Sequence, residues 1–181
     1  MRAGQLLPVA RYKQVTSPTS GLVTAPADAF REVMAGVATP VAVVTTLTGD
    51  GPHGTTVSSF ASLSLAPPMV MAALDRSSGL LSRLAVGAPF GVNLLGSSQA
   101  ELAGVFARRS EDEFAGVEWS EHAGAPRLAG CPGWLACEVT DLVPGGDHVI
   151  VLATVLHAAA GAGAPLTYHG RRFGTHAPVA A

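Results

Sequence analysis

Short runs of β-branched and aliphatic residues, separated by glycine- or proline-containing turns, make up most of this chain. The runs have the length of strands and lie at 41–48, 55–65, 69–74, 90–95, 134–143, 149–157 and 166–168. Three stretches indicate helices, near 28–37, 80–86 and 98–106. Because helices do not alternate regularly with the strands, the pattern predicts a mainly β (α+β) fold, a closed antiparallel barrel with a few flanking helices.

Turn and capping signals set the expected ends of these elements. Residues 49–52 and 144–147 have the composition of hairpin turns. The first helix has an apolar stripe at helical spacing, with Asp28 as its expected N-cap: Phe30, Val33, Met34 and Val37. Residues 98–101 fit a capping box that opens a helix with three inward side chains: Leu102, Val105 and Phe106.

The 181 residues suffice for one domain. Residues 1–26 mix Pro, Ser, Thr and Gly without periodicity, so we expect a flexible N-terminal arm. The domain is expected over 27–176, with a short tail at 177–181. No apolar run is long enough to span a membrane, and the N-terminus lacks a secretory apolar region, so a cytoplasmic protein is expected.

Charge and cysteine content exclude several classes of function. The net charge of -2 argues against nucleic acid as a partner, since phosphate binding needs a surplus of Lys and Arg. Cys131 and Cys137 lack the spacing of metal ligands and are too few for a disulfide framework, so no metal site is expected, and Cys137 is interpreted as a core residue. Charged residues make up only 13% of the chain, which leaves apolar surface for a second subunit.

Residues 54–65 carry the strongest functional signal. If they form one strand, alternation places Val57, Ser59, Ala61, Leu63 and Leu65 on a core face. The other face then carries an aromatic ring among four hydroxyls: Thr56, Ser58, Phe60, Ser62 and Ser64. Such a face can bind the polar edge of a planar heterocycle and its phosphate, although alternation alone favours the solvated face of an edge strand.

The order of several short blocks resembles a known family. They are Phe30-Arg31, 43–46 (VVTT), 51–54 (GPHG), 58–64 (SSFASLS), 67–70 (PPMV), 90–95 (FGVNLL), Gln99, 106–107 (FA), 114–116 (FAG), 137–139 (CEV), 146–148 (GDH) and 165–168 (PLTY). Across roughly residues 28–175 this succession is similar to the short-chain flavin reductases of two-component monooxygenases. That resemblance implies an FMN-binding split barrel, a homodimer and a partner monooxygenase.

The resemblance also implies roles for individual residues. Those expected at the flavin are Thr55, Thr56, Val57, Ser58, Ser59, Ser62, Leu63, Ser64, Asp75, Ser77 and Ser78. Residues 56–59 would lie along the flavin ring, and Ser62 and Ser64 would approach the ribityl-phosphate. Arg109, near the end of a helix, is a further candidate for a phosphate contact.

Two more segments are expected to bind the nicotinamide. Gly146 and Asp147 belong to a tight turn whose glycines are also explained by backbone geometry alone. His148 is expected to be the catalytic residue that contacts the nicotinamide, although a lone His can equally satisfy nearby strand groups. The resemblance places Tyr168, Arg171 and Phe173 near the mouth of the active site, where an Arg can meet a pyrophosphate.

The predicted activity is hydride transfer from NADH or NADPH to FMN, or alternatively to FAD. This reaction requires no nucleophile or acid–base pair, because the flavin supplies the chemistry. The chain contains neither a GxGxxG dinucleotide fingerprint nor a P-loop, so the nicotinamide is expected to visit a shallow site. Two alternatives remain open: a non-catalytic flavin- or haem-binding barrel, and a related FMN-dependent oxidase.

Overall fold

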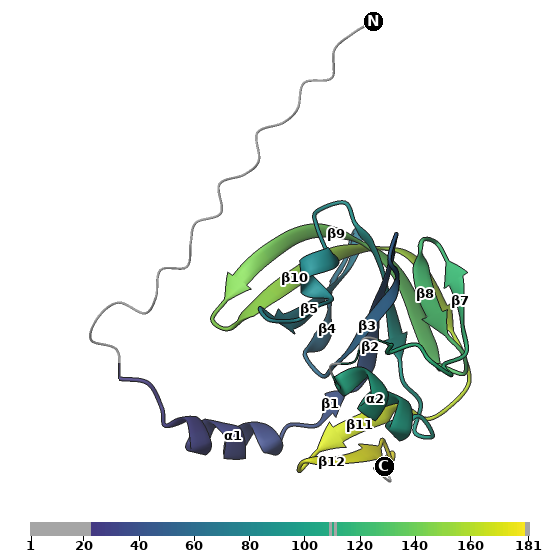
Figure 1. Cartoon of the computed structure of the whole chain (residues 1–181). Helices are drawn as coiled ribbons and strands as arrows, with labels where there is room; N and C mark the ends of the chain where they lie inside the picture. The colour runs from purple at the N-terminus through teal and green to yellow at the C-terminus, as the bar shows by residue number, and fades with distance from the viewer. Residues whose placement is uncertain (1–22, 109, 111, 180–181) are drawn as a thin grey trace, which may run out of the picture.

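The computed structural model describes residues 23–108, 110 and 112–179. Its body is one antiparallel seven-stranded sheet in the order β3-β2-β6-β9-β10-β5-β4 (Figure 1). These strands are β2 (Ala42–Thr48), β3 (Gly51–Val57), β4 (Phe60–Leu65), β5 (Pro68–Asp75), β6 (Pro89–Leu94), β9 (Gly133–Gly145) and β10 (His148–Ala160).

Smaller elements surround this sheet. A second sheet contains β1 (Thr39–Pro40), β11 (Leu166–His169) and β12 (Arg172–Thr175), and a hairpin contains β7 (Trp119–His122) and β8 (Ala125–Leu128). The helices are α1 (Ala27–Ala35), α2 (Ala100–Ala107) and the single 3₁₀ turn η1 (Leu81–Arg83). The prediction of a mainly β fold with few helices is therefore confirmed.

The two edge strands of the large sheet, β3 and β4, follow each other in sequence. Only Ser58 and Ser59 separate them, and we call these two residues the bend. β3 pairs with β2 and β4 pairs with β5, but no hydrogen-bonded ladder joins β3 to β4 among the described strands. The sheet curves so that its two edges meet at the bend, and the predicted closed barrel is not confirmed.

The prediction of one continuous strand over 55–65 is wrong. Val57 is buried as expected, whereas Leu63 and Leu65, placed on the same face by alternation, are 47% and 91% exposed. Phe60, predicted on the polar face, packs against the core. The alternation of side chains between the two faces restarts at the bend and shifts again at a bulge between Ser62 and Ser64. A single alternating pattern therefore cannot assign the faces of both strands.

Two apolar clusters lie on opposite faces of β2. Ala42 and Val44 belong to one cluster, which also contains Cys137, and Val43 belongs to the other, which also contains Phe106. Successive side chains of a strand point to opposite faces, so β2 is buried on both sides. The interpretation of Cys137 as a core residue is confirmed, since its side chain is 1% exposed.

A buried polar network attaches the β7–β8 hairpin to the large sheet. The Asn93 side chain, on β6, accepts a hydrogen bond from the Leu128 amide at 2.8 Å and donates to the Thr45 hydroxyl at 3.2 Å. The Thr45 hydroxyl donates in turn to the Pro126 carbonyl at 2.6 Å. Both side chains are fully buried, so each bond satisfies a group that water cannot reach.

Helix α2 packs against the face of β3 that carries Gly54 and Thr56. The Thr56 hydroxyl donates to the Ala103 carbonyl at 2.8 Å, and the Gly54 amide donates to a Glu113 carboxylate oxygen at 3.0 Å. A Cβ atom on Gly54 would lie 2.7 Å from the Phe106 ring, so this close approach requires glycine. Glu113, which lies after α2 in the chain, therefore satisfies an amide at the edge of β3 that an additional strand would otherwise pair with.

The capping predictions are wrong at both helices. Pro26 precedes α1 without a side-chain cap, and Asp28 instead pairs with Arg31 at 2.6 Å. Gln99, not Ser98, precedes α2, and its side chain accepts from the Gly96 amide at 2.8 Å. The Gln99 side chain serves the preceding loop, so no capping box forms.

Helix packing follows the predicted stripes only in part. Phe106 is buried, but Val105, predicted to point inward, is 38% exposed. The stripe of α1 has exposed fractions of 59% at Phe30, 71% at Val33, 44% at Met34 and 43% at Val37. Figure 1 shows α1 standing apart from the large sheet. Its apolar face is therefore not covered by the described part of the chain.

Most of the expected N-terminal arm, residues 1–22, and residues 180–181 of the expected tail lie outside the described residues. Within the part that is described, no helix combines the length and hydrophobicity required to cross a bilayer.

Candidate functional site

The bend brings several predicted residues together. The Ser59 hydroxyl donates to the Ala73 carbonyl at 2.7 Å, and the Ala73 amide donates to the Ser59 carbonyl at 3.0 Å. Ser58 is exposed, and its hydroxyl has no hydrogen-bond partner among the described residues. The two neighbouring hydroxyls, of Thr56 and Ser59, already donate to backbone carbonyls, so Ser58 offers the free donor of this segment.

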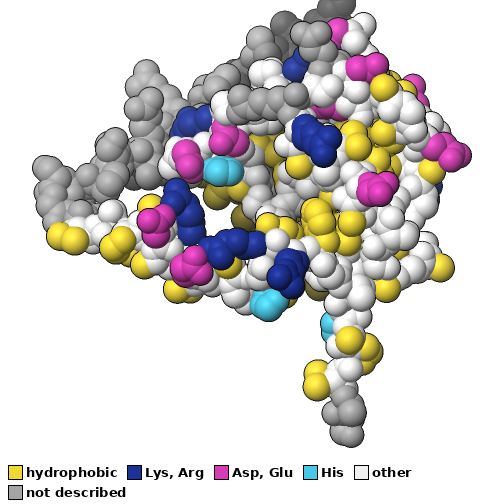
Figure 2. Space-filling model, turned by 60° about the horizontal axis from the view of Figure 1, so that its bottom comes forward, with side chains coloured by type: hydrophobic (Ala, Val, Ile, Leu, Met, Phe, Trp, Pro, Cys, Tyr) yellow, Lys and Arg dark blue, Asp and Glu magenta, His cyan; other side chains and the backbone are white. Residues whose placement is uncertain are grey.

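Two hollows adjoin at Ser58 and Tyr168. The first, of about 260 Å³, is largely apolar and is lined by Val41, Thr56, Val57, Ser58, Ala107, Tyr168 and Phe173. The second, of about 390 Å³, lies beneath α1 and includes Phe30, Arg31, Met34, Ser58, Tyr168 and Arg171. Figure 2 shows an opening bordered by basic, acidic and histidine side chains, with hydrophobic side chains beside it.

An aromatic pair forms one wall of the first hollow. Tyr168 of β11 and Phe173 of β12 lie edge to face with ring centroids 5.4 Å apart. A two-residue turn joins the strands, with positive φ at both Gly170 and Arg171. Such turns match the twist of paired strands and hold the two rings at opposed positions.

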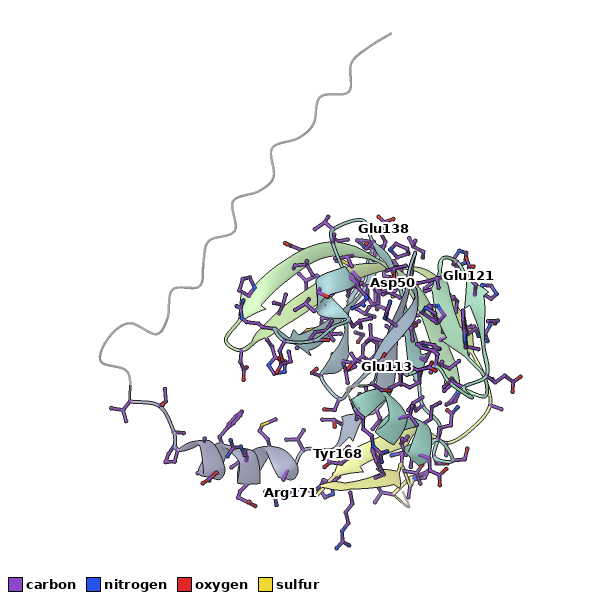
Figure 3. The ribbon with its side chains drawn as sticks, viewed as in Figure 1. Asp50, Glu113, Glu121, Glu138, Tyr168 and Arg171 are labelled. Carbon is purple, nitrogen blue, oxygen red and sulfur yellow. The ribbon has the colours of Figure 1, made fainter. Side chains whose placement is uncertain are left out.

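Arg171 connects this turn to α1. Its guanidinium forms an ion pair with Glu32, and the Gly170 amide donates to the Ala35 carbonyl at 2.8 Å. The hydrogen bond and charge of Glu32 raise the pKa of Arg171 above its usual value. Figure 3 shows Tyr168 and Arg171 at this end of the molecule, beside α1.

The other predicted residues form a second group, in which a loop holds a turn. The turn is residues 146–148, where Gly146 has a φ of 66° and His148 begins β10. Arg76 of the loop donates from its amide to the Asp147 carbonyl at 3.0 Å and from Nε to the Gly146 carbonyl at 2.8 Å. His148 pairs with Asp75 in the ladder between β10 and β5. The two segments therefore lie side by side.

Side chains fix the conformation of both segments. Asp75 accepts hydrogen bonds from the Ser77 amide, at 2.7 Å, and from the Ser77 hydroxyl. The His148 ring lies with Nδ1 2.8 Å from an Asp147 carboxylate oxygen. This contact lowers the pKa of Asp147, first through the hydrogen bond and then through the charge of His148. When Nδ1 carries the proton and donates to Asp147, Nε2 faces away as the free ring nitrogen.

A third hollow, of about 470 Å³, opens beside this loop. Its lining includes Ser77, Leu80, Arg83, Asp50 and Glu113, the last two labelled in Figure 3. Hydrogen bonds from Thr48 and His53 keep the pKa of Asp50 far below its usual value, so Asp50 is ionised and pairs with Arg83 at 3.2 Å.

The structure divides the predicted site residues between two groups. The hollows contain Thr56, Val57, Ser58, Tyr168, Arg171 and Phe173; the loop and turn contain Asp75, Ser77, Ser78, Gly146, Asp147 and His148. Ser59 connects them, because its partner Ala73 lies two residues before Asp75 on β5. Residues 146–148 line neither of the two adjoining hollows.

The remaining predicted residues lie outside these groups. Thr55 is half-buried within β3, and Ser62, Leu63 and Ser64 lie on β4, where the Ser64 hydroxyl accepts from the Ala66 amide at 3.3 Å. Arg109 lies outside the described residues. Sequence reasoning missed Val41, Ala107 and Arg31 as lining residues, and Arg76 as the contact between loop and turn.

The chain belongs to the family described as the flavin reductase like domain, whose model matches residues 34–177. It is 39% identical over 149 residues to the reductase component of the 4-nitrophenol 4-monooxygenase/4-nitrocatechol 2-monooxygenase of Rhodococcus opacus, a match that covers 82% of this chain and 80% of that protein. It is also 39% identical over 155 residues to an NADH:riboflavin 5'-phosphate oxidoreductase of Streptomyces pristinaespiralis, covering 83% and 88%.

Solved structures agree in fold. The NADH:FAD oxidoreductase of Streptomyces globisporus C-1027, in complex with NAD and FAD fragments, superposes with a TM-score of 0.80 at 35% identity. That match covers 88% of this chain and 99% of the other. The order and spacing of the blocks in the sequence therefore identified the family correctly.

Proposed function

We propose that this protein is an NAD(P)H:flavin oxidoreductase that reduces FMN or FAD with NADH or NADPH and supplies the reduced flavin to a partner monooxygenase. Membership of the flavin reductase family supports the proposal. A relative named as an NADH:riboflavin 5'-phosphate oxidoreductase supports flavin reduction by a nicotinamide. A relative named as the reductase component of a monooxygenase supports the supply of reduced flavin to such a partner.

The observation that carries the proposal is the position of Ser58. Its free hydroxyl lies where two hollows adjoin, one of them with an apolar, aromatic lining. An isoalloxazine ring has apolar faces and a polar edge, and therefore needs such a combination of apolar walls and a few polar groups. The residues present thus fit a flavin, with residues 56–59 along its ring.

The flavin, when bound, supplies the chemistry by accepting a hydride from C4 of the nicotinamide at its N5 atom. The protein's own residues bind and orient the two rings. In this proposal His148 contacts the nicotinamide through its ring, held by Asp147, while Tyr168 and Phe173 form the wall of the site. Arg171 is proposed to meet the dinucleotide phosphates, for which it exchanges its contact with Glu32.

We also propose that the protein is a homodimer. The apolar stripe of α1 and the exposed Leu63 and Leu65 of β4 are the support, because isolated subunits rarely expose such groups of large side chains. Light scattering at micromolar concentration measures the mass directly. A particle of about 37 kDa, twice the 18.3 kDa chain, is expected, and a monomer would contradict this part of the proposal.

The test of the activity follows NADH and NADPH absorbance at 340 nm with FMN, FAD and riboflavin in separate reactions. Oxidation of a nicotinamide that depends on added flavin is expected. If neither nicotinamide is oxidised with any flavin, although flavin fluorescence shows binding, the protein is a non-catalytic flavin carrier. If the bound flavin is reduced by another organic substrate and by neither nicotinamide, the protein is the related FMN-dependent oxidase.

Substituting His148→Ala tests the nicotinamide role. Loss of the ring contact is expected to raise KM for NADH roughly tenfold, with KM for the flavin changed less than about twofold. An unchanged KM for NADH would refute the role of His148 while leaving the flavin reductase activity intact.

A further inference from the structure

Arg76 makes an unusual pair of contacts for an exposed arginine. Its amide donates to the Asp147 carbonyl at 3.0 Å, and its side-chain Nε donates to the neighbouring Gly146 carbonyl at 2.8 Å. Both acceptors belong to the two-residue turn between β9 and β10. One residue of the loop after β5 thus holds both central carbonyls of that turn.

The contact lies just beyond the end of a ladder. The last pair between β10 and β5 is His148 with Asp75, so strand pairing leaves Gly146 and Asp147 unsupported from this side. Gly146 has a φ of 66°, a conformation that glycine adopts without strain. The pairing of Gly145 with His148 closes the turn, and Arg76 adds the contact that supports it from the side of β5.

The turn at Gly146 and Asp147 also fixes the orientation of the His148 ring. Asp147 contributes both the carbonyl that accepts from Arg76 and the carboxylate beside His148 Nδ1. On the other side, Asp75 holds the loop by accepting from Ser77. Ser77 thus holds Asp75, and Arg76, the next residue in the chain, holds the turn whose Asp147 contacts the His148 ring.

From this geometry we infer that Arg76 is a positioning residue, which sets the orientation of the His148 ring toward the nicotinamide through its bond to the Gly146 carbonyl. The inference rests on the proposed function and adds a residue to it. In this inference Arg76 acts by donating a directed hydrogen bond, not by its positive charge. The donor is Nε, the guanidinium nitrogen nearest the backbone, and its partner is the neutral Gly146 carbonyl.

The first experiment compares Arg76→Met and Arg76→Lys by steady-state kinetics with NADH and FMN. Loss of Nε is expected to raise KM for NADH roughly fivefold in both variants, with kcat and KM for FMN within about twofold of the original protein. Full recovery in Arg76→Lys would overturn the inference, because lysine restores charge but not the Nε geometry. Arg127→Met removes a half-buried arginine of β8 that stacks over Trp134, outside both groups of site residues. It is the control for loss of a positive charge and is expected to leave both KM values unchanged.

The second experiment is a double-mutant cycle between Arg76→Met and His148→Ala. If Arg76 acts through His148, the two effects on KM for NADH are not additive, and Arg76→Met has no further effect once the ring is absent. Additive effects, or an unaffected KM in Arg76→Met, would overturn the inference. The thermal midpoint of each variant shows whether the protein as a whole remains folded.

The third experiment replaces NADH with N-benzyl-1,4-dihydronicotinamide, which lacks phosphates. Positioning through His148 predicts the same fold-change in KM as with NADH, whereas attraction between the guanidinium and phosphates predicts no change and would overturn the inference. Failure of the proposed function is distinguishable, since the original protein would then oxidise neither reductant with any flavin.

Discussion

The centre of the sheet and its rim are held together in different ways. At the centre, Asn93 and Thr45 are fully buried and bonded to each other beside the apolar cluster that contains Val43 and Leu128. At the rim, the bend, the loop and the turn rely on hydrogen bonds of exposed side chains such as Ser59, Arg76 and Asp147. A buried polar group is costly to leave unpaired, while an exposed one regains water.

This difference separates stability from function. Substitutions at the centre are expected to change the free energy of unfolding, and substitutions at the rim are expected to change binding constants at nearly constant stability. Binding residues on loops positioned by a rigid scaffold commonly behave in this way. The following predictions test the contrast, from the largest effect to the smallest.

The largest effect is expected for Asn93→Ala. It leaves the Leu128 amide without its buried acceptor and removes the donor to the Thr45 hydroxyl, so the free energy of unfolding should fall by about 3 kcal/mol. Urea denaturation followed by tryptophan fluorescence measures it. Ser59→Ala removes a comparable bond at the rim and is the matched control, with an expected loss of about 1 kcal/mol or less. Equal losses of unfolding free energy in the two variants would contradict the proposed difference between the centre and the rim.

The second prediction concerns alkaline pH. Burial raises the pKa of the Cys137 thiol from 9.0 to about 12. Above pH 9 the unfolded chain releases this proton while the folded chain keeps it, so the free energy of unfolding should fall by about 1.4 kcal/mol for each pH unit between those values.

The comparison for this prediction is Cys137→Ala, in which the free energy of unfolding should fall less steeply between pH 9 and pH 12. Denaturation midpoints measured at half-unit intervals give both slopes. Identical slopes in the two proteins would mean that another group causes the alkaline loss.

The smallest effect is expected at the ion pair between Glu32 and Arg171. Glu32→Gln releases the guanidinium for dinucleotide phosphates, so KM for NADH should fall roughly twofold and become more sensitive to salt, with no measurable change in the thermal midpoint. Glu138→Gln, which removes an exposed carboxylate of β9 outside the hollows, is the control and is expected to leave KM for NADH unchanged. A rise in KM would show that Glu32 supports the site instead of competing with the phosphates.

Local signals in the sequence predicted much of the fold. The hairpin turns at 49–52 and 144–147 are confirmed, because the turn chemistry is contained in four residues. The bend was missed, since the predicted single strand continues one alternation across Ser58 and Ser59, while in the structure the strand pairing and the side-chain alternation both restart there. The amphipathic pattern of α1 predicted a helix correctly but does not specify what covers its apolar face.

The sequence identified the segments of the candidate site but not how these segments contact one another. The loop at 75–78 and the turn at 146–148 were identified separately, and the structure places them in contact. The contact of Arg76 with Gly146 and the pair between Glu32 and Arg171 join residues 70 and 139 positions apart. Spacing along one chain carries no information about such long-range contacts.

The contact between Glu113 and the edge of β3 has a consequence for behaviour at high concentration. An exposed strand edge can recruit a strand from another molecule and begin aggregation. Here the Gly54 amide, one of the groups that would template such growth, donates instead to the carboxylate of Glu113, under the helix that carries Ala103 and Phe106. The same small residue that lets α2 approach thus helps to keep the protein in solution.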